Sequence, residues 1–155
     1  MSAPSPRAWQ RAAPRGTFTV ETKLRMRPVE GAGASSAHAG LIAYRNDDLH
    51  AMLTRAGSQA RPIAFAKELA AQGVRERGAM PVAPSAEVTW LRLAHRVDPH
   101  NGEHEYRSAS SPDGVHWDWG GTWTLPRGRD PRIGLVSLGG RGAVARFDYF
   151  RVLRP

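Results

Sequence analysis

The strongest candidate for acid–base chemistry in this sequence is the segment Glu103-His104-Glu105. Carboxylates two residues apart point to the same side of a β-strand, and hydrolysis of a glycosidic bond needs two carboxyl groups at a defined separation. The segment follows the turn signal Asn101-Gly102, and it has no third carboxylate in the spacing Glu-x-Asp-x-x-Glu. We therefore expect a solvated strand end here and predict no catalytic role for Glu103 or Glu105.

Histidines near the same turn are the strongest candidates for metal ligands. His95, His100 and His104, with Asp98 between them, carry suitable donor atoms, but zinc ligands must converge on one point and these straddle a predicted hairpin. The chain has no cysteine, which excludes disulfides and thiolate sites. The run 139–142 lacks the Lys-Ser/Thr ending of a phosphate loop, and no Gly-x-Ser-x-Gly elbow occurs. We predict neither a metal site nor a cofactor from these residues.

The composition is typical of one globular domain built of short strands. The chain has 155 residues, of which 41% are hydrophobic and 23% charged, and this size suits a single core. Sixteen glycines and twelve prolines fit frequent turns. No apolar run approaches the roughly 20 residues of a membrane-spanning helix, so we predict no membrane partner. Residues 1–14 lack the apolar stretch of a signal peptide, so we expect a cytoplasmic protein or one part of a longer secreted protein.

The formal charge of +8 raises the question of nucleic-acid binding. All basic residues except Lys23 and Lys67 are arginines, and they are scattered from Arg7 to Arg154 without forming a run. Binding patches usually cluster their charges. An Arg-rich nucleic-acid-binding domain therefore stays open as an alternative, and nucleic acid is not the partner that we expect.

The hydrophobic pattern predicts about ten strands after an irregular lead-in over residues 1–15, with a single domain over residues 16–155. The clearest strand is expected at 17–27. Phe18 and the alternate residues after it point inward, while a charged row that includes Lys23 points outward. In the strand over 87–97, Leu91 and Leu93 share one face, and Trp90 and Arg92 the other. The remaining strands are expected at 40–45, 49–55, 103–110, 115–119, 121–125, 132–138 and 143–153, with turns every 8–12 residues.

Residues 63–77 are ambiguous between a helix and strands. Their Ala, Leu, Glu, Lys and Gln residues favour a helix. Ile63, Phe65, Lys67, Leu69 and Ala71 also alternate as a strand requires.

The segment Ser111-Pro112-Asp113-Gly114-Val115-His116-Trp117 resembles the Ser-x-Asp-Gly-x-x-Trp hairpin of the concanavalin A-like lectin/glucanase β-sandwiches. In particular, it is similar to the C-terminal accessory domain of family 43 glycoside hydrolases, the β-xylosidases and arabinofuranosidases. Further segments agree with that family in the same order: 16–23, 39–44 with Asp47-Asp48, 90–93, 131–135 and 147–152. The resemblance covers residues 9–152 and implies strands at 63–77 and an all-β fold, an antiparallel two-sheet β-sandwich of the concanavalin A-like jelly-roll type.

The resemblance implies a non-catalytic, carbohydrate-associated domain of a glycoside hydrolase that acts on plant-type polysaccharide. Such a domain either binds an oligo- or polysaccharide or packs as a purely structural unit on a catalytic partner. It also implies a possible structural calcium near the last strand, to which Asp148 could contribute an oxygen. Sugar rings stack on aromatic side chains and need flanking polar groups. The expected carbohydrate-binding residues are Tyr44, His50, Trp90, Arg92, Tyr106 and Trp117. Each aromatic residue could instead fill the core.

Overall fold

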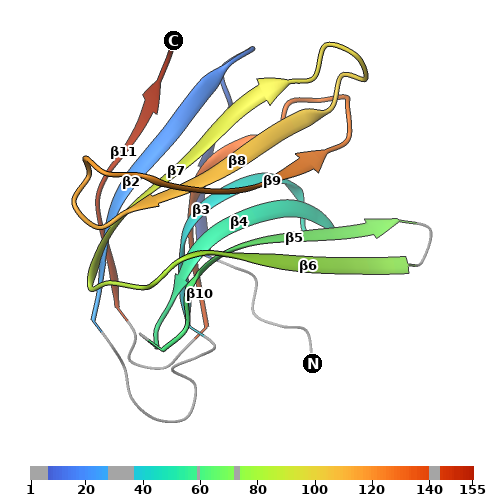
Figure 1. Ribbon diagram of the computed structural model, residues 1–155. Coiled ribbons are helices and arrows are strands. Elements are labelled where there is room, and N and C mark those ends of the chain that lie inside the picture. The colour runs from blue at the N-terminus through green and yellow to red at the C-terminus, as the bar shows by residue number, and fades with distance from the viewer. Residues whose placement is uncertain (1–6, 28–36, 59, 72–73, 140–143) are drawn as a thin grey trace.

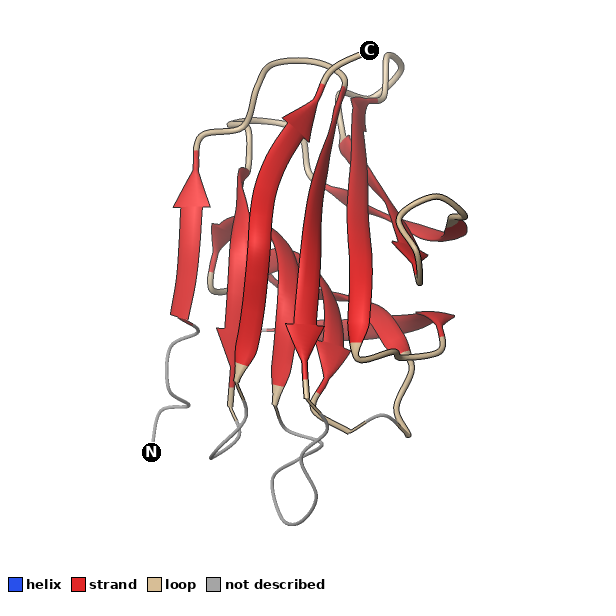
Figure 2. Ribbon diagram, turned by 90° about the vertical axis from the view of Figure 1, so that its left-hand side faces the viewer, coloured by secondary structure: helices blue, strands red, loops and turns tan. Residues whose placement is uncertain are grey.

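The computed structural model describes residues 7–27, 37–58, 60–71, 74–139 and 144–155. These residues form strands and loops (Figure 2), and none of them forms a helix long and apolar enough to cross a bilayer. The strands, in chain order, are β1 (Arg7–Arg11), β2 (Phe18–Met26), β3 (His38–Asn46), β4 (Leu49–Ala56), β5 (Ile63–Ala71), β6 (Val74–Ala83), β7 (Val88–Val97), β8 (His104–Ser111), β9 (Asp118–Leu125), β10 (Arg132–Leu138) and β11 (Ala145–Leu153).

The strands form two antiparallel sheets that pack face to face (Figure 1). The six-stranded sheet has the order β1-β10-β3-β4-β5-β6, and the five-stranded sheet has the order β11-β2-β7-β8-β9. Strand neighbours that are far apart in sequence, such as β10 with β3 and β11 with β2, bring the C-terminal part of the chain beside its N-terminal part. The predicted all-β, two-sheet sandwich is therefore confirmed.

The core consists of the inward rows that the alternation predicts. In β2, Phe18, Val20 and Leu24 are buried, and in β7 Leu91 and Leu93 are buried opposite them. Burial of such side chains contributes about 1.5–3 kcal/mol each. The residues of a surface site must therefore come from the outward rows of the two sheets.

Within the ambiguous segment 63–77, residues 63–71 and 74–77 form strands. Within β5, Ile63 and Phe65 are buried in the core, and β5 pairs with β4 on one side and β6 on the other. The indole Nε1 of Trp123 also donates a hydrogen bond to the Phe65 carbonyl at 2.8 Å. Pairing on both edges and burial outweigh the helix propensity of this segment, which amounts to a few tenths of a kcal/mol per residue.

Several strand boundaries differ from the sequence predictions. Residues 7–11, expected in the irregular lead-in, form β1, which pairs with β10 at the sheet edge; Trp9 lies edge-on against Phe150 with ring centroids 5.1 Å apart. Residues 115–117 belong to a turn, and a single strand, β9, runs through Gly120. Residues 28–36, and all but the first residue of the glycine run at 139–142, lie outside the described residues.

Candidate functional site

The expected carbohydrate-binding residues lie in three different places. Tyr44 and His50 are on the outer face of the six-stranded sheet, on β3 and β4. Trp90 and Arg92, on β7, and Trp117, in the turn before β9, are on the outer face of the five-stranded sheet. These two faces are on opposite sides of the sandwich, so the predicted set cannot form one site.

Tyr106 is in neither group, and its predicted role in binding is wrong. Its side chain is 0% exposed, and the register places it beside His95 of β7 and Trp123 of β9 on the inner face. Burial raises the pKa of its hydroxyl well above the ordinary value. A phenol enclosed in this way cannot contact a ligand at the surface.

A buried carboxylate organises the outer face of the five-stranded sheet. Glu21 of β2 is 1% exposed and accepts hydrogen bonds from Arg92 Nε at 2.6 Å and Tyr149 Oη at 2.7 Å, while Arg151 also contacts it. Burial by itself raises the pKa of Glu21, but these hydrogen bonds and the charge of Arg92 outweigh it, so the pKa lies below its usual value. Burial, together with the hydrogen bond to Glu21, raises the pKa of Tyr149 to about 12. Arg92 is therefore held by β2 and is not free to turn toward a ligand.

Cations cover the tryptophan rings on this face. Lys23 lies 5.0 Å from the centre of the Trp90 ring, and the Arg92 guanidinium lies 3.9 Å from the centre of Trp117. Each contact is worth about 0.5–2 kcal/mol. On Trp90 the Gly114 backbone also approaches so closely that a Cβ there would lie 3.0 Å from the indole. Trp90 and Trp117 therefore pack within the sheet and hairpin.

Asp113 holds the hairpin that carries the Ser-x-Asp-Gly-x-x-Trp segment. Its Oδ1 accepts the backbone N–H groups of Val115 and His116, both at 2.8 Å, and the hydroxyl of Ser111 at 3.0 Å. These bonds, with the His116 ring, hold the pKa of Asp113 well below its usual range. Gly114 has φ = +79°, which glycine adopts without strain. The motif thus forms an ordered turn, and Trp117 at its end packs on Arg92.

The outer face of the six-stranded sheet is hollowed over β4, β5 and β6. The hollow has a volume of about 530 Å³, and its lining includes His50, Met52, Ala66, Glu68, Arg77 and Ala79. His50 Nε2 lies 3.5 Å from Glu68, and the His50 ring stacks on Tyr44 with centroids 6.3 Å apart. Tyr44 is fixed in turn by a 2.6 Å hydrogen bond to Asp47. The hollow therefore combines a small apolar floor with ordered polar groups.

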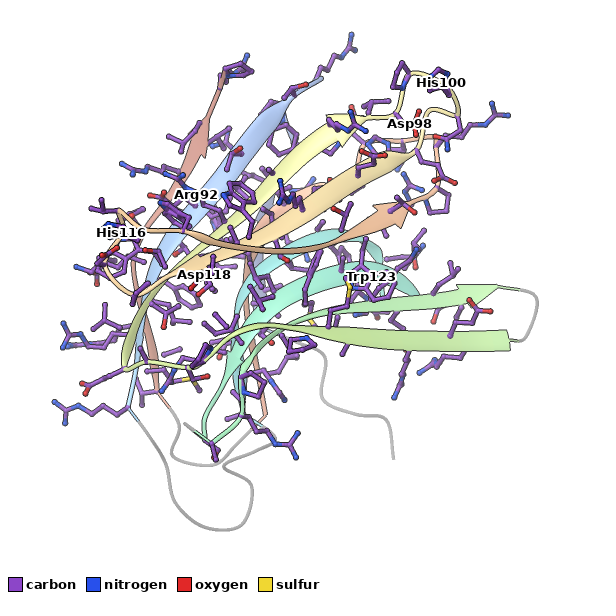
Figure 3. All side chains as sticks on the ribbon, viewed as in Figure 1. Arg92, Asp98, His100, His116, Asp118 and Trp123 are labelled. Atoms are coloured by element: carbon purple, nitrogen blue, oxygen red, sulfur yellow. The ribbon has the colours of Figure 1, made fainter. Side chains whose placement is uncertain are left out.

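The candidate metal ligands lie in two separate pairs. His95 Nε2 contacts His104 Nδ1 at 3.0 Å within the core, while Asp98 and His100 lie in the loop at the end of β7 (Figure 3). No group of three or more metal-binding side chains converges within the described ranges. Asp148, considered for calcium, forms an ion pair with Lys23 at 3.4 Å.

Glu105 is engaged on the outer face of the five-stranded sheet. It pairs with Arg96 of the neighbouring strand β7. His104, between the two glutamates, is buried. In the segment Glu103-His104-Glu105, His104 therefore belongs to the core and Glu105 to an ion pair, while Glu103 lies at the strand end.

Sequence reasoning missed the charged residues that organise both faces. Glu21 belongs to the alternating charged row of its strand, yet its burial depends on Tyr149 and Arg151 from the far end of the chain. Glu68 and Arg77 were inside the segment that was ambiguous between helix and strand. Only the register of β5 with β6 places them opposite each other.

Comparison with known proteins agrees with this architecture. Neither a protein-family model nor a curated protein matches the sequence. Among solved structures, a xylan β-1,4-xylosidase from Bacillus halodurans is 21% identical with a TM-score of 0.71, over 97% of this chain and 30% of that one. A mutant of the GH43 protein BlXynB from Bacillus licheniformis is 17% identical with a TM-score of 0.68, over 95% of this chain and 29% of that one. The carbohydrate-binding module CBM66 from Bacillus subtilis is 12% identical with a TM-score of 0.50, over 90% of this chain and 76% of that one.

These similarities show a shared fold. The chain spans less than a third of each of the two Bacillus proteins of xylosidase or GH43 type, so it corresponds in size to one part of them. The predicted likeness to a β-sandwich in family 43 glycoside hydrolases is confirmed at the level of the fold.

Proposed function

We propose that this chain is a non-catalytic, carbohydrate-associated accessory domain that binds saccharide on the outer face of its six-stranded sheet. The observation that carries the proposal is the hollow over β4, β5 and β6, with polar groups at His50 and Glu68 around a floor of small side chains. Concave sites with a few ordered polar groups are typical of small-molecule binding. The shared fold with a carbohydrate-binding module and with parts of xylosidase and GH43 proteins supports the class of ligand.

The choice of face rests on what covers the aromatic rings. Trp90 and Trp117 are covered by Lys23 and Arg92, whereas the hollow beside His50 is open. A sugar on the five-stranded sheet would have to displace those cations. Binding on the six-stranded sheet requires no such displacement.

The experiment is retention of the purified chain on immobilised xylan, arabinoxylan and cellulose at low and high salt. We expect retention that resists high salt, is lost in His50→Ala and is kept in Trp119→Ala on the opposite face. Incubation with aryl glycosides is expected to give no turnover. Absence of retention on every glycan would contradict the proposal, and retention that disappears at high salt would point to binding driven by the arginines.

A second candidate function uses the opposite face. Trp119 is 43% and Val115 72% exposed beside the ordered hairpin, and these apolar groups could pack on a catalytic domain in a longer protein. This chain corresponds to less than a third of the xylosidase and GH43 chains, which favours a role as one domain packed on another. The two functions are compatible because they use opposite faces of the sandwich.

A further inference from the structure

We infer that the hollow on the six-stranded sheet binds a neutral saccharide through two neighbouring hydroxyl groups held by Glu68 and Arg77, and that it disfavours acidic sugars. This inference rests on the proposed function and adds the class of ligand and the groups that recognise it. It starts from the floor, where Met52, Ala66 and Ala79 leave room for the apolar C–H face of a sugar ring. The polar groups that would select the ligand surround this floor.

Glu68 is the centre of these polar groups. Its side chain is 18% exposed, and its Oε1 lies 3.0 Å from Arg75 Nη1 and 3.2 Å from Arg77 Nη2. Its other oxygen, Oε2, faces His50 Nε2 at 3.5 Å, which is too long for a strong hydrogen bond. One carboxylate oxygen is therefore occupied by guanidinium groups, and the other can accept a hydrogen bond from a ligand hydroxyl.

Arg77 supplies the complementary donors. Its side chain is 66% exposed, and a guanidinium has five N–H donors, of which those not facing Glu68 can reach a ligand oxygen. A sugar hydroxyl both donates and accepts. Two adjacent hydroxyls thus match an adjacent carboxylate and guanidinium: one donates to Glu68 Oε2 and the next accepts from Arg77. Hydrogen bonds to charged groups of this kind are the strong ones.

His50 is a positioning residue for this pair. Its side chain is 12% exposed, and it is held between the Tyr44 ring and Glu68. The neighbouring β5 and β6 are in register at Glu68 and Arg77, so the sheet itself holds the two charges side by side. The recognition pair is therefore fixed before a ligand arrives, which lowers the entropic cost of binding.

The local charge selects against an acidic ligand. Arg75 pairs with Asp48 at 3.7 Å as well as with Glu68, so its guanidinium is already engaged by two carboxylates. A ligand carboxylate placed at the site of the hydroxyls would lie against Glu68 Oε2. Two carboxylates that face each other repel, whereas a neutral hydroxyl is not repelled by Glu68.

The test is titration of the whole isotope-labelled chain, followed by amide chemical shifts, with xylotriose and separately with trigalacturonate. The variants are Glu68→Gln, which keeps the shape of the side chain, and Arg77→Gln, which changes an exposed side chain outside the core. Trp119→Ala on the opposite face is the matched control. We expect xylotriose to shift amides of β4, β5 and β6, with binding about tenfold weaker in each of the first two variants and changed less than about twofold in the control.

The outcomes separate this inference from the function on which it rests. Tighter binding of trigalacturonate than of xylotriose would overturn the ligand class. Saccharide binding that shifts β7–β9 and is lost only in Trp119→Ala would overturn the hollow as the site and leave a carbohydrate-associated function standing. Absence of binding by any neutral or acidic oligosaccharide, together with no retention on polysaccharides, would overturn the proposed function itself.

Discussion

Replacement of Glu21 by Gln removes one negative charge from the outer face of the five-stranded sheet while keeping the shape of the side chain. The carboxylate is 1% exposed and is bound by Arg92, Tyr149 and Arg151. Loss of one partner of a fully buried ion pair costs about 3–5 kcal/mol. The Arg92 side chain is 24% exposed and that of Arg151 55%, so both can regain water. We therefore expect a loss of about 2–3 kcal/mol in the free energy of unfolding at pH 7.

The pH dependence of the stability provides a second, independent test of this prediction. Folding lowers the pKa of Glu21 below the unfolded value of about 4.3. Its contribution is therefore complete above that pH and is lost as the pH falls through the lower folded pKa, where the unfolded state binds more protons. The gap between wild type and Glu21→Gln should thus be largest near neutral pH and should shrink in acid.

The assay is urea unfolding followed by tryptophan fluorescence at pH 7 and pH 3, with thermal unfolding as a check. A loss of about 2–3 kcal/mol corresponds to a fall of about 4–12 °C in Tm for a chain of this size. Glu105→Gln is the control, because its partner Arg96 has a side chain that is 64% exposed and such a pair contributes about 1 kcal/mol or less. Equal stability of Glu21→Gln and wild type, or a gap that is the same at both pH values, would refute the reasoning.

Three further predictions concern packing and protonation. Gly40→Ala should destabilise the chain by about 1–3 kcal/mol or more in urea unfolding, because a Cβ there would lie 1.9 Å from the Leu53 carbonyl oxygen. Gly114→Ala should cost more than Gly16→Ala in the same assay: both positions have φ = +79°, but only the Cβ of the first would meet Trp90. Burial lowers the pKa of His95, so stability should decline below about pH 6.5 by at most about 1.4 kcal/mol per pH unit, and His95→Gln should show a smaller decline.

Each of these has an outcome that would count against it. Wild-type stability in Gly40→Ala would mean that β3 and β4 can move apart without cost. Equal losses in the two glycine variants would mean that the hairpin does not press on Trp90. A wild-type slope in His95→Gln would assign the decline below pH 6.5 to other groups.

Much of the fold could be predicted because alternation is a local property. Leu91 and Leu93 point inward and Trp90 and Arg92 outward, as their period of two requires. The composition of residues 63–71 misleads because helix propensity is also local, whereas the pairing of β5 with β4 and β6 is not. The candidate site was less predictable, since its residues come from strands whose order in the sheet no local pattern gives.

The sequence by itself determined the class of the fold, the inward row of each clear strand and the turn at Asp113-Gly114, because side-chain alternation and turn chemistry act between neighbouring residues. Only the tertiary structure decided which outward rows share a face. It placed Tyr106 in the core beside His95, separated Tyr44 from Trp90 by the thickness of the sandwich, and brought Tyr149 to Glu21 across 128 residues of sequence. The physical reason is that long-range hydrogen bonds and core packing fix the order and register of the strands. They decide which residues of different strands lie side by side, and the sequence around each residue carries no signal of this.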